Sequence, residues 1–290
     1  MKISEEIRRK WKPRKKTAHK GDFGRIFIVA GSKGLTGAAY LAGMGALRAG
    51  AGLVTVGVPD KVYSVIARRE AEVMVTPFAS TSEGALAYRG VQAILDFAAH
   101  QDVLALGPGL SQNSQTQKLI RALIAKSQGP LVIDADGLNA LKGHAPVLRY
   151  CRSRAVLTPH PGEFTRIFGG KLNTQDAHRK KRAKETAVRF GVVLVLKGYH
   201  TVIAHPDGRV IINPTGNPGM ASGGTGDVLT GIIAAFIGQR FSLWDAARFG
   251  VYLHGLAGDL AAKKFGQISL TAGDLLALLP AAIRKATRPF

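Results

Sequence analysis

The sequence predicts an α/β protein in which a mostly parallel sheet is covered by helices on both faces. Two observations lead to this prediction. Short runs rich in β-branched residues recur along the chain, and segments long enough to form helices separate them. Several of the short runs are apolar without alternation, which is typical of strands that are buried on both faces. With 290 residues, 46% of them hydrophobic, the chain can bury a substantial core.

Strands and helices are expected to alternate from residue 25 onward. The expected strands are residues 25–30, 53–58, 103–106, 131–134, 155–158 and 192–196. The expected helices are residues 37–49, 113–126, 174–190, 227–237, 242–264 and 271–287. Residues 201–204 and 210–212 are expected to pair as a hairpin at one edge of the sheet, because Asp207-Gly208 between them supplies turn dihedral angles.

The chain is expected to form one domain with a basic arm in front of it. Residues 21–290 contain no linker, repeat or low-complexity tract, and residues 1–20 form a loose, basic N-terminal arm without the apolar run of a secretory signal. The best membrane candidate, residues 34–58, contains Arg48 and seven glycines, so we expect no membrane span. A single cysteine, Cys151, excludes a disulfide framework and favours a cytoplasmic location.

The formal net charge of +21 favours an anionic ligand. Much of the excess lies in the arm and in residues 179–189, which are expected to be a solvated tail and a solvated helix face. Neither stretch interleaves aromatic side chains as a single-strand nucleic-acid binder would. There is also no helix-turn-helix or zinc pattern. A nucleic-acid-associated binding protein remains the alternative from a different class, but nucleotide phosphates explain the sign of the charge equally well.

The most informative segment is glycine-rich and leads directly into an apolar helix. Residues 213–227 read Asn-Pro-Thr-Gly-Asn-Pro-Gly-Met-Ala-Ser-Gly-Gly-Thr-Gly-Asp. Glycines leave backbone amides uncovered, and the start of a helix adds a partial positive charge, so the segment predicts an anion hole. Asp227 beside a bound phosphate could accept a proton as general base, or it could only cap the helix. The pattern is neither a Walker A loop nor a dinucleotide fingerprint.

Other polar side chains follow predicted strands, where ligands of such sheets bind. Asp134 and Asp136 flank the end of one strand and suit a hydrated Mg²⁺ near phosphate, although Asp136 is equally expected to cap a helix. His160 is held between two prolines at the end of the next strand. Lys197 ends a third strand, where its ammonium could attract phosphate or simply be solvated.

These segments together resemble the ribokinase-like superfamily. Gly-Gly-Thr-Gly-Asp at a helix start late in an α/β chain is similar to its anion-hole motif, and within it the chain is most similar to the NAD(P)H-hydrate dehydratases. The resemblance extends over residues 21–258. It rests on Val29-Ala-Gly-Ser-Lys-Gly-Leu-Thr-Gly-Ala-Ala39, Gly107-Pro-Gly109, Asp134-Ala-Asp-Gly-Leu-Asn139, Leu157-Thr-Pro-His-Pro-Gly-Glu163 and Leu196-Lys-Gly198, followed by the glycine-rich segment.

The resemblance implies a role for particular residues. Asp227 would be the catalytic base, and Ala38, Gly109 and His160 would contact the nicotinamide substrate together with it. Glu163, and with it Asp134, would hold Mg²⁺ through water. Related small-molecule kinases typically have Asn where His160 stands. The adenine nucleotide would be bound by Lys197, Gly198, Tyr199, His200, Thr201, Asn217, Gly223, Gly224, Thr225 and Gly226, and the region from Ser242 to His254 would finish its pocket.

The implied reaction is the nucleotide-dependent dehydration of the S form of NADH or NADPH hydrate. Phosphorylation of the ring hydroxyl by ADP or ATP would let the ring nitrogen expel phosphate and restore the reduced cofactor. The choice between the two donors stays open. Relatives are often oligomers, so a homo-oligomer is expected. Many members also carry an epimerase domain, which the twenty residues before the first strand cannot hold, so we expect this chain to cover the dehydratase step alone.

The alternative enzyme is a small-molecule kinase of the same superfamily, similar to hydroxyethylthiazole or hydroxymethylpyrimidine kinases. Such a kinase would share Asp227 and the anion hole. It would not be expected to combine His160 between prolines with Ala30-Gly-Ser32 at the end of the first strand.

Overall fold

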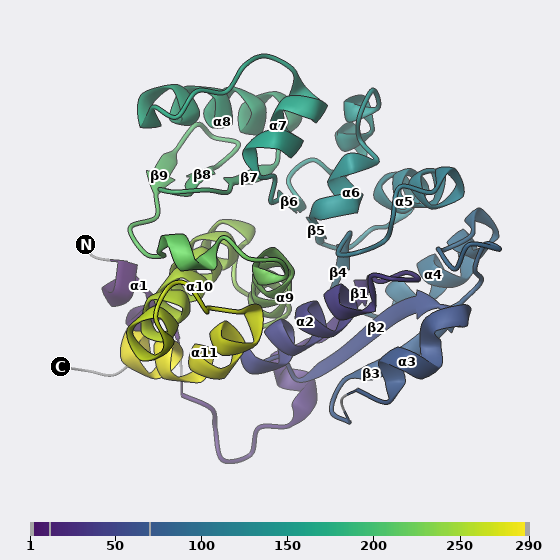
Figure 1. Ribbon diagram of the computed structural model, residues 1–290, viewed down its shortest axis with the longest axis horizontal. Helices are drawn as coiled ribbons and strands as arrows, with labels where there is room; N and C mark the ends of the chain where they lie inside the picture. The colour runs from purple at the N-terminus through teal and green to yellow at the C-terminus, as the bar shows by residue number, and fades with distance from the viewer. Residues whose placement is uncertain (1–2, 12, 70, 288–290) are drawn as a thin grey trace.

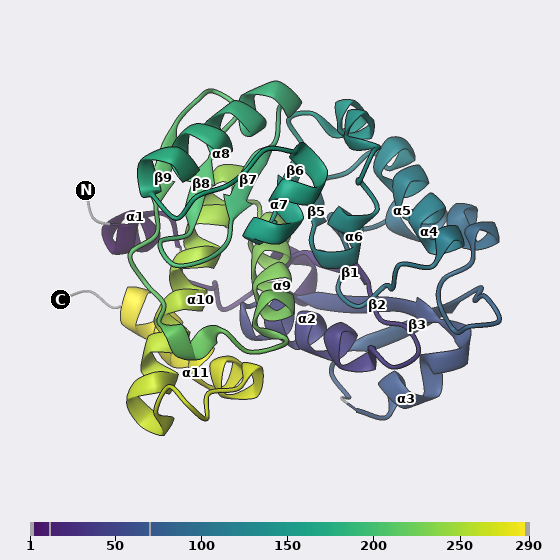
Figure 2. The ribbon, with the colours of Figure 1, turned by 45° about the horizontal axis from the view of Figure 1, so that its top comes forward.

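A nine-stranded sheet forms the centre of the computed structural model, which describes residues 3–11, 13–69 and 71–287 (Figures 1 and 2). Lys12 of the basic arm and the last three residues of the predicted domain lie outside the described residues. The strand order is β3-β2-β1-β4-β5-β6-β7-β8-β9. The strands are β1 (Arg25–Val29), β2 (Leu53–Pro59), β3 (Met74–Phe78), β4 (Val103–Leu106), β5 (Leu131–Ile133), β6 (Ala155–Leu157), β7 (Val193–Leu196), β8 (Val202–Ala204) and β9 (Val210–Ile212).

Strands β1 to β7 are all parallel, and β8 and β9 continue the sheet as an antiparallel edge. The prediction of a mostly parallel sheet with an edge hairpin is therefore confirmed. The six predicted strands and six predicted helices are all present, with ends that differ from the prediction by at most two residues.

Successive side chains of each strand enter two different cores, because they point to opposite faces of the sheet. In β1, Ile26 and Ile28 join one apolar cluster, whereas Phe27 and Val29 join the other. The first face is covered by α2 (Thr36–Arg48), α3 (Tyr63–Ala67), α9 (Thr225–Gly238), α10 (Leu243–Phe265) and α11 (Ala272–Thr287). The second is covered by α4 (Val91–Ala98), α5 (Ser114–Lys126), α6 (Ala135–Asn139), α7 (Pro161–Phe168) and α8 (Asp176–Phe190).

Several elements were not expected from the sequence. Strand β3 contains Pro77, which reads as a break, but β3 is the edge strand, where a proline costs no ladder hydrogen bond on its free side. Helix α7 starts with Pro161, a residue that fits the first turn of a helix. Helices α3 and α4 and five 3-10 turns were also missed: η1 (Lys20–Phe23), η2 (Asp60–Val62), η3 (Tyr88–Gly90), η4 (Ala145–Cys151) and η5 (Pro218–Met220).

The N-terminal segment is not loose where it is described. Helix α1 (Ile3–Lys10) packs on α10 and α11, and the side chain of Ile7 is fully buried. Arg248 of α10 forms an ion pair with Glu6 at 2.7 Å, and Lys10 pairs with Asp245. The expectation of a loose arm is therefore wrong for these residues, because Ile3 and Ile7 share one face of a helical turn and bury it.

Helices α2 and α9 approach so closely that their backbones touch. A Cβ atom on Gly231 would overlap the carbonyl oxygen of Ala42, and one on Gly45 would lie 2.5 Å from the carbonyl oxygen of Val228. This contact fixes the start of α9 beside the carboxyl ends of the central strands. Among the described helices, none combines the length and the apolar character that crossing a membrane requires.

Candidate active site

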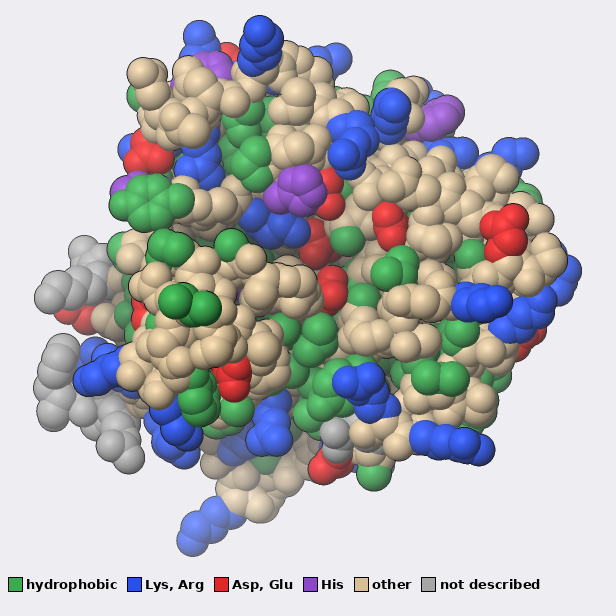
Figure 3. Space-filling view, in the orientation of Figure 1, with side chains coloured by type: hydrophobic (Ala, Val, Ile, Leu, Met, Phe, Trp, Pro, Cys, Tyr) green, Lys and Arg blue, Asp and Glu red, His purple; other side chains and the backbone are tan. Residues whose placement is uncertain are grey.

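The predicted site residues come from the segments that follow β1, β4, β5, β6, β7 and β9 and from the start of α9. On the face shown in Figure 3, acidic, basic and histidine side chains gather between α9 and the helices α6 and α7. Strand order reverses between β1 and β4, since β1 leads outward to β2 on one side and the chain returns to β4 on the other. Ligands of doubly wound sheets bind at such a switch point.

Asp134 and Lys197 form a buried ion pair at the ends of β5 and β7. The Lys197 ammonium donates to Oδ1 of Asp134 at 2.7 Å, and the Thr230 hydroxyl of α9 donates to Oδ2 at 2.7 Å. Only 1% of Asp134 is exposed. Burial by itself would lower the pKa of Lys197, but the carboxylates of Asp134, Glu163 and Asp227 together raise it, so the ammonium stays charged.

Glu163 is buried beside this pair, in the first turn of α7. Its Oε2 accepts the backbone N–H of His160 at 2.8 Å. Burial raises the pKa of Glu163, while the Lys197 charge lowers it and the Asp134 charge raises it again. The pKa of Glu163 therefore depends on both members of the ion pair.

His160 caps α7 through one ring nitrogen, and its other ring nitrogen lies near the carboxylate of Glu163. Its Nδ1 accepts the backbone N–H groups of Gly162 at 3.0 Å and Glu163 at 3.3 Å. Because Nδ1 is the acceptor, the neutral ring carries its hydrogen on Nε2. Half of the side chain is exposed, and Nε2 lies 3.5 Å from Oε1 of Glu163. The Nε2–H is thus a donor directed by the cap.

Asp227 lies in the first turn of α9, and its side chain is partly buried. Burial raises its pKa to about 7; the Asp134 and Asp136 charges add to the rise, and the Lys197 charge opposes it. A carboxyl group with a pKa near 7 is well matched to proton abstraction at neutral pH.

The first backbone amides of α9 come before its first regular helical hydrogen bond and so have no acceptor within the helix. That bond runs from the Val228 N–H to the Gly224 carbonyl at 3.2 Å, so the amides of Thr225, Gly226 and Asp227 have no intrahelical acceptor. Gly223 has open space on the side where a Cβ would stand, and Gly224 has a φ of +91°. The Thr225 hydroxyl instead donates to loop carbonyls of Met220 and Ser222, which leaves its amide as the group available to an anion.

The loop that precedes the free amides of α9 is hydrogen-bonded to α10. Asn217 accepts the Gly219 N–H with Oδ1 and donates through Nδ2 to Asp259 of α10, both at 3.0 Å. The Gly216 N–H donates to the other oxygen of Asp259. The side chain of Asn217 is therefore engaged in holding the loop.

Residues 197–201 form a turn that is held by Arg179 of α8. The buried guanidinium donates to the carbonyl oxygens of Lys197 at 3.3 Å and His200 at 3.2 Å, and also to those of Leu196 and Tyr199. The expectation that Arg179 belongs to a solvated basic stretch is wrong for this residue, because its side chain is buried. Within the turn, Gly198 has a φ of +129°, Thr201 donates its hydroxyl to the Gly198 carbonyl, and the exposed ring of Tyr199 stacks on His200.

Ala38, in the first turn of α2, and Gly109, in the loop after β4, lie against each other. Gly109 has a φ of +63°, and a Cβ there would stand 2.9 Å from the Cβ of Ala38. The Ser32 hydroxyl donates to the Gly109 carbonyl at 2.8 Å and fixes the turn. The two residues predicted to contact one substrate are thus neighbours.

One residue near the site, Thr230 of α9, was not predicted from the sequence. Thr230 lies one helical turn after Gly226, a spacing that could have identified it. His254 of α10 donates from Nε2 to the Thr225 carbonyl at 2.8 Å, and burial lowers its pKa to about 4, so the ring is neutral. Ser242, by contrast, lies about 18 Å along α10 from His254 at 1.5 Å per residue, so only the His254 end of the predicted region reaches the site.

The described residues contain no cluster of three or more His, Cys, Asp or Glu side chains that could hold a metal ion. Both oxygens of Asp134 are bonded to Lys197 and Thr230. Asp136 accepts the Ser111 amide of the loop after β4 at 2.9 Å and the Asn139 side chain at 3.1 Å. The expectation that Asp136 caps the helix is therefore wrong, because Asp134 is the N-cap residue of α6 and the Asp136 side chain bonds no backbone amide of that helix. A metal would therefore depend on water and on ligand oxygens.

Comparison with known proteins agrees with these features. Residues 26–281 match the family model described as NAD(P)H-hydrate dehydratase. The chain is 48% identical over 271 residues to the bifunctional NAD(P)H-hydrate repair enzyme Nnr of Moorella thermoacetica, covering 93% of this chain and 51% of that protein. The chain spans about half the length of the curated relatives it matches.

Solved structures have the same fold. The ADP/ATP-dependent NAD(P)H-hydrate dehydratase of Bacillus subtilis, co-crystallised with ATP and Mg²⁺, is 32% identical with a TM-score of 0.80, covering 98% of this chain and 97% of that one. A ribokinase-like superfamily protein of Enterococcus faecalis is 29% identical with a TM-score of 0.84, covering 99% and 95%. These matches confirm the predicted ribokinase-like fold.

Proposed function

Because this chain belongs to the NAD(P)H-hydrate dehydratase family, we propose that it dehydrates the S form of NADH hydrate or NADPH hydrate with ADP or ATP as phosphoryl donor. The observation that carries the proposal is the position of Asp227, a carboxyl group with a pKa near 7 directly after the free amides that open α9. At this position the amides can bind a phosphate while the carboxylate takes a proton from an alcohol.

Asp227 acts as general base in this proposal. Its carboxylate takes the proton of the ring hydroxyl as the hydroxyl oxygen attacks the terminal phosphorus of the nucleotide. The ring nitrogen then expels phosphate, the C–O bond breaks, and loss of one ring proton restores the reduced nicotinamide. The net change is loss of water from the substrate, driven by cleavage of the nucleotide.

The amides of Thr225, Gly226 and Asp227 stabilise the charge of the transferring phosphoryl group. Lys197 adds a fixed positive charge close to them, since its ammonium would lie 3.4 Å from a Cβ placed on Gly226. Asp134 and Thr230 position this ammonium, and Arg179 positions the turn that follows it. We propose that Gly198, Tyr199, His200, Thr201 and Asn217 border the rest of the nucleotide, with Gly223 and Gly224 giving its phosphates room.

Ala38, Gly109 and His160 are proposed to contact the nicotinamide substrate. The first two form a surface of small residues at the switch point, on which a flat ring can lie. His160 offers its Nε2–H as a donor to an oxygen of the substrate.

Mg²⁺ fits this site through water. The ion usually keeps several waters and is bound by one or two carboxylates together with substrate phosphates. Of the two predicted residues, Glu163 is better placed to contact such waters, because both oxygens of Asp134 are bonded to protein groups. When bound, the ion would neutralise charge on the phosphates.

The test is incubation with (S)-NADH hydrate or (S)-NADPH hydrate, Mg²⁺ and either ADP or ATP, followed by the absorbance of the reduced cofactor. Absorbance should recover only when a nucleotide is present, and the two donors can be ranked by rate. Asp227→Ala should abolish recovery while nucleotide binding, measured by calorimetry, is largely kept.

Other outcomes identify the alternatives. Recovery without any nucleotide contradicts the proposed mechanism. Transfer of labelled phosphate from the nucleotide to a stable alcohol product would identify a small-molecule kinase instead. Nucleic-acid binding that falls steeply with salt and survives Asp227→Ala would support the binding-protein alternative.

Assembly and location are separate proposals. We propose that the chain forms a homo-oligomer, which light scattering of the purified protein tests directly. A cytoplasmic location is proposed from the use of a single cysteine, and fractionation of cells tests it.

A further inference from the structure

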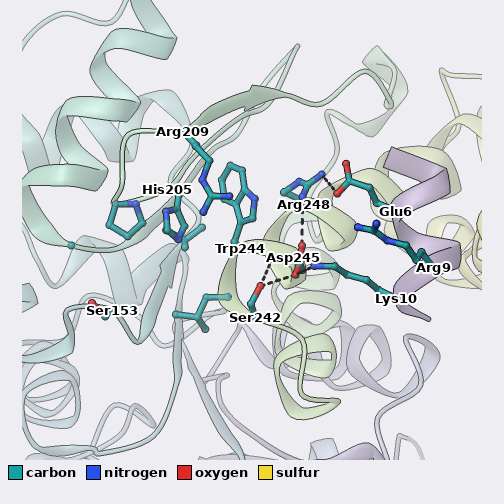
Figure 4. Close-up of a pocket in the computed structure, with 14 residues that line it drawn as sticks. Glu6, Arg9, Lys10, Ser153, His205, Arg209, Ser242, Trp244, Asp245 and Arg248 are labelled. Carbon is teal, nitrogen blue, oxygen red and sulfur yellow. Dashed lines mark hydrogen bonds and ion pairs between the residues drawn. The ribbon is translucent and has the colours of Figure 1, made fainter. Parts of the chain in front are cut away.

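A cavity lies at the opposite end of the strands from the proposed active site. It has a volume of about 620 Å³ and is lined by α1, the β8–β9 turn, the start of α10 and the loops that precede β6 and β7 (Figure 4). Ser153 and Gly191 of its wall come before β6 and β7, whereas Glu163 and Lys197 come after those strands. The cavity is large enough for a small molecule and shares no residue with the proposed active site.

The lining of this cavity carries more positive than negative charge. Four of its side chains are Arg9, Lys10, Arg209 and Arg248, and its carboxylates are Glu6 and Asp245. Both carboxylates are already neutralised from within the lining: Glu6 pairs with Arg248, and Asp245 pairs with Lys10 and, at 3.5 Å, with Arg248 (Figure 4). The charges of Arg9 and Arg209 are thus in excess.

Arg9 and Arg209 are available to a ligand. Within the part of the chain that the structure describes, no side chain or carbonyl accepts a hydrogen bond from Arg9. Among the described residues, the ion-pair partner of Arg209 is Asp207, across an exposed turn at 2.7 Å. Both side chains are about half exposed, so solvent screens this contact strongly. The two guanidinium groups face the cavity from opposite sides in Figure 4, one from α1 and one from the edge hairpin. Each presents a planar fork of donors that suits an anion with several oxygens.

Flat rings form another part of the wall. Trp244 lies between the guanidinium groups of Arg209 and Arg248, at 5.4 and 5.5 Å from its ring, and His205 meets it edge-on at 5.4 Å. Further hydrogen bonding is also unsatisfied here, since Nε of Arg248 is buried without an acceptor among the described residues. The cavity therefore offers more than a phosphate ion would fill.

We propose that this cavity binds a phosphate group, either free or carried by a small organic molecule, through Arg9 and Arg209, with Trp244 and His205 beside the organic part. Such a ligand would join α1 to the edge hairpin. The proposal does not depend on the reaction assigned to Asp227.

Trp244 provides a readout that is specific to this cavity. The chain has two tryptophans, and the other, Trp11, packs edge-on against Phe236. In a Trp11→Phe background, the emission of Trp244 is followed while inorganic phosphate or phenyl phosphate is added at constant ionic strength, with chloride as the control anion. Saturable change with phosphate, and tighter binding of phenyl phosphate if an organic group is recognised, is expected.

Matched variants separate this cavity from the active site. Arg9→Ala and Arg209→Ala should each weaken binding at least tenfold, as expected for loss of a charged hydrogen bond. Lys180→Ala, which removes an exposed charge from α8, and Asp227→Ala should leave it unchanged. The proposal is overturned if neither anion gives saturation, or if Arg9→Ala together with Arg209→Ala binds as tightly as the parent. Should Trp11→Phe fail to fold, the indole N–H resonance of Trp244 in the unaltered chain gives the same comparison.

Discussion

At the scale of single residues, Asp227 combines two properties that a general base needs. It stands beside free amides that can hold phosphate, and burial together with neighbouring carboxylates raises its pKa to about 7. The nearby ammonium of Lys197 keeps the pKa from rising further. These opposing influences leave a substantial fraction of Asp227 ionised near neutral pH.

The first prediction is a pH profile set by Asp227. The base must be ionised, so kcat/KM should fall about tenfold for each pH unit below 7 and level off above it. Steady-state rates of cofactor recovery between pH 5 and 9 measure this. A profile that is flat across pH 7 would contradict the assignment.

The same group makes a matching prediction for stability. Because folding raises this pKa above its usual 3.8, the folded state binds the proton more tightly, and the associated stability is lost as pH rises through about 7. The free energy of unfolding of Asp227→Asn should therefore exceed that of the parent by roughly 1–3 kcal/mol at pH 8, with no such gain at pH 4. Urea denaturation at the two pH values gives the comparison.

The second prediction concerns the cap formed by His160. His160→Ala removes the acceptor for two amides of α7 and should cost about 1 kcal/mol, together with the donor to the substrate. His160→Asn should keep both functions, since Oδ1 can cap the helix while Nδ2 donates. Unfolding free energies and kcat/KM of both variants decide this. Equal losses in the two variants would show that the cap does not orient the ring.

The third prediction distinguishes positioning from metal binding at Asp134. Lys197→Met should cost about 3–5 kcal/mol, because it leaves the buried Asp134 carboxylate unpaired. Adding Asp134→Asn should recover part of that loss. Thermal unfolding of the single and double variants measures the coupling between the two residues.

Magnesium dependence supplies the functional half of this test. Glu163→Gln should raise the Mg²⁺ concentration needed for half-maximal rate, while Asp134→Asn should lower kcat with little change in that concentration. A large shift for Asp134→Asn and none for Glu163→Gln would reverse the proposed roles.

At the scale of elements, the α2–α9 contact holds in place the proposed phosphate site, which is formed by the amides of residues 225–227. Both helices contribute glycines where their backbones meet, and Gly231 has no room for a Cβ beside the Ala42 carbonyl. Helix α9 was predicted from its apolar run, but its start at Thr225 is fixed by this packing and by His254, which bonds the Thr225 carbonyl.

The fourth prediction follows from that contact. Gly231→Ala should lower the unfolding free energy by about 3 kcal/mol and reduce activity, because α9 must move away from α2. Gly37→Ala, in the facing helix α2 but with open space around it, should be neutral or stabilising by up to about 1 kcal/mol. Urea titration of both variants measures the difference. Similar losses at the two positions would argue against a close approach of the helices.

At the scale of the whole molecule, helix α1 near the start of the chain packs against the C-terminal helices α10 and α11 and contributes to their core. The fifth prediction is that Ile7→Ala lowers the unfolding free energy by about 2–4 kcal/mol, since this side chain is fully buried between α1 and the C-terminal helices. Arg9→Ala, an exposed change in the same helix, should stay within about 0.5 kcal/mol. Chemical denaturation of the two variants provides the check.

Sequence alone determined the fold class, most of the strands and the residues that approach each other in the site. It could do so because apolar runs, turn residues and glycines act locally, and the carboxyl ends of parallel strands meet at one edge by necessity. Strand β3 and helix α7 lacked such local signals, because β3 contains Pro77 and α7 starts with Pro161.

Only the tertiary structure decided how the site residues are used. Arg179 looks like a solvated charge in sequence, but packing turns it toward four carbonyl groups of the 196–200 turn. Asp134 looks like a metal ligand, but Lys197 and Thr230, which are 63 and 96 residues away, occupy its oxygens. The pKa of Asp227 likewise depends on burial and on charges from other loops. Hydrogen bonds and fields between distant segments depend on distance in space, which the order of residues does not contain.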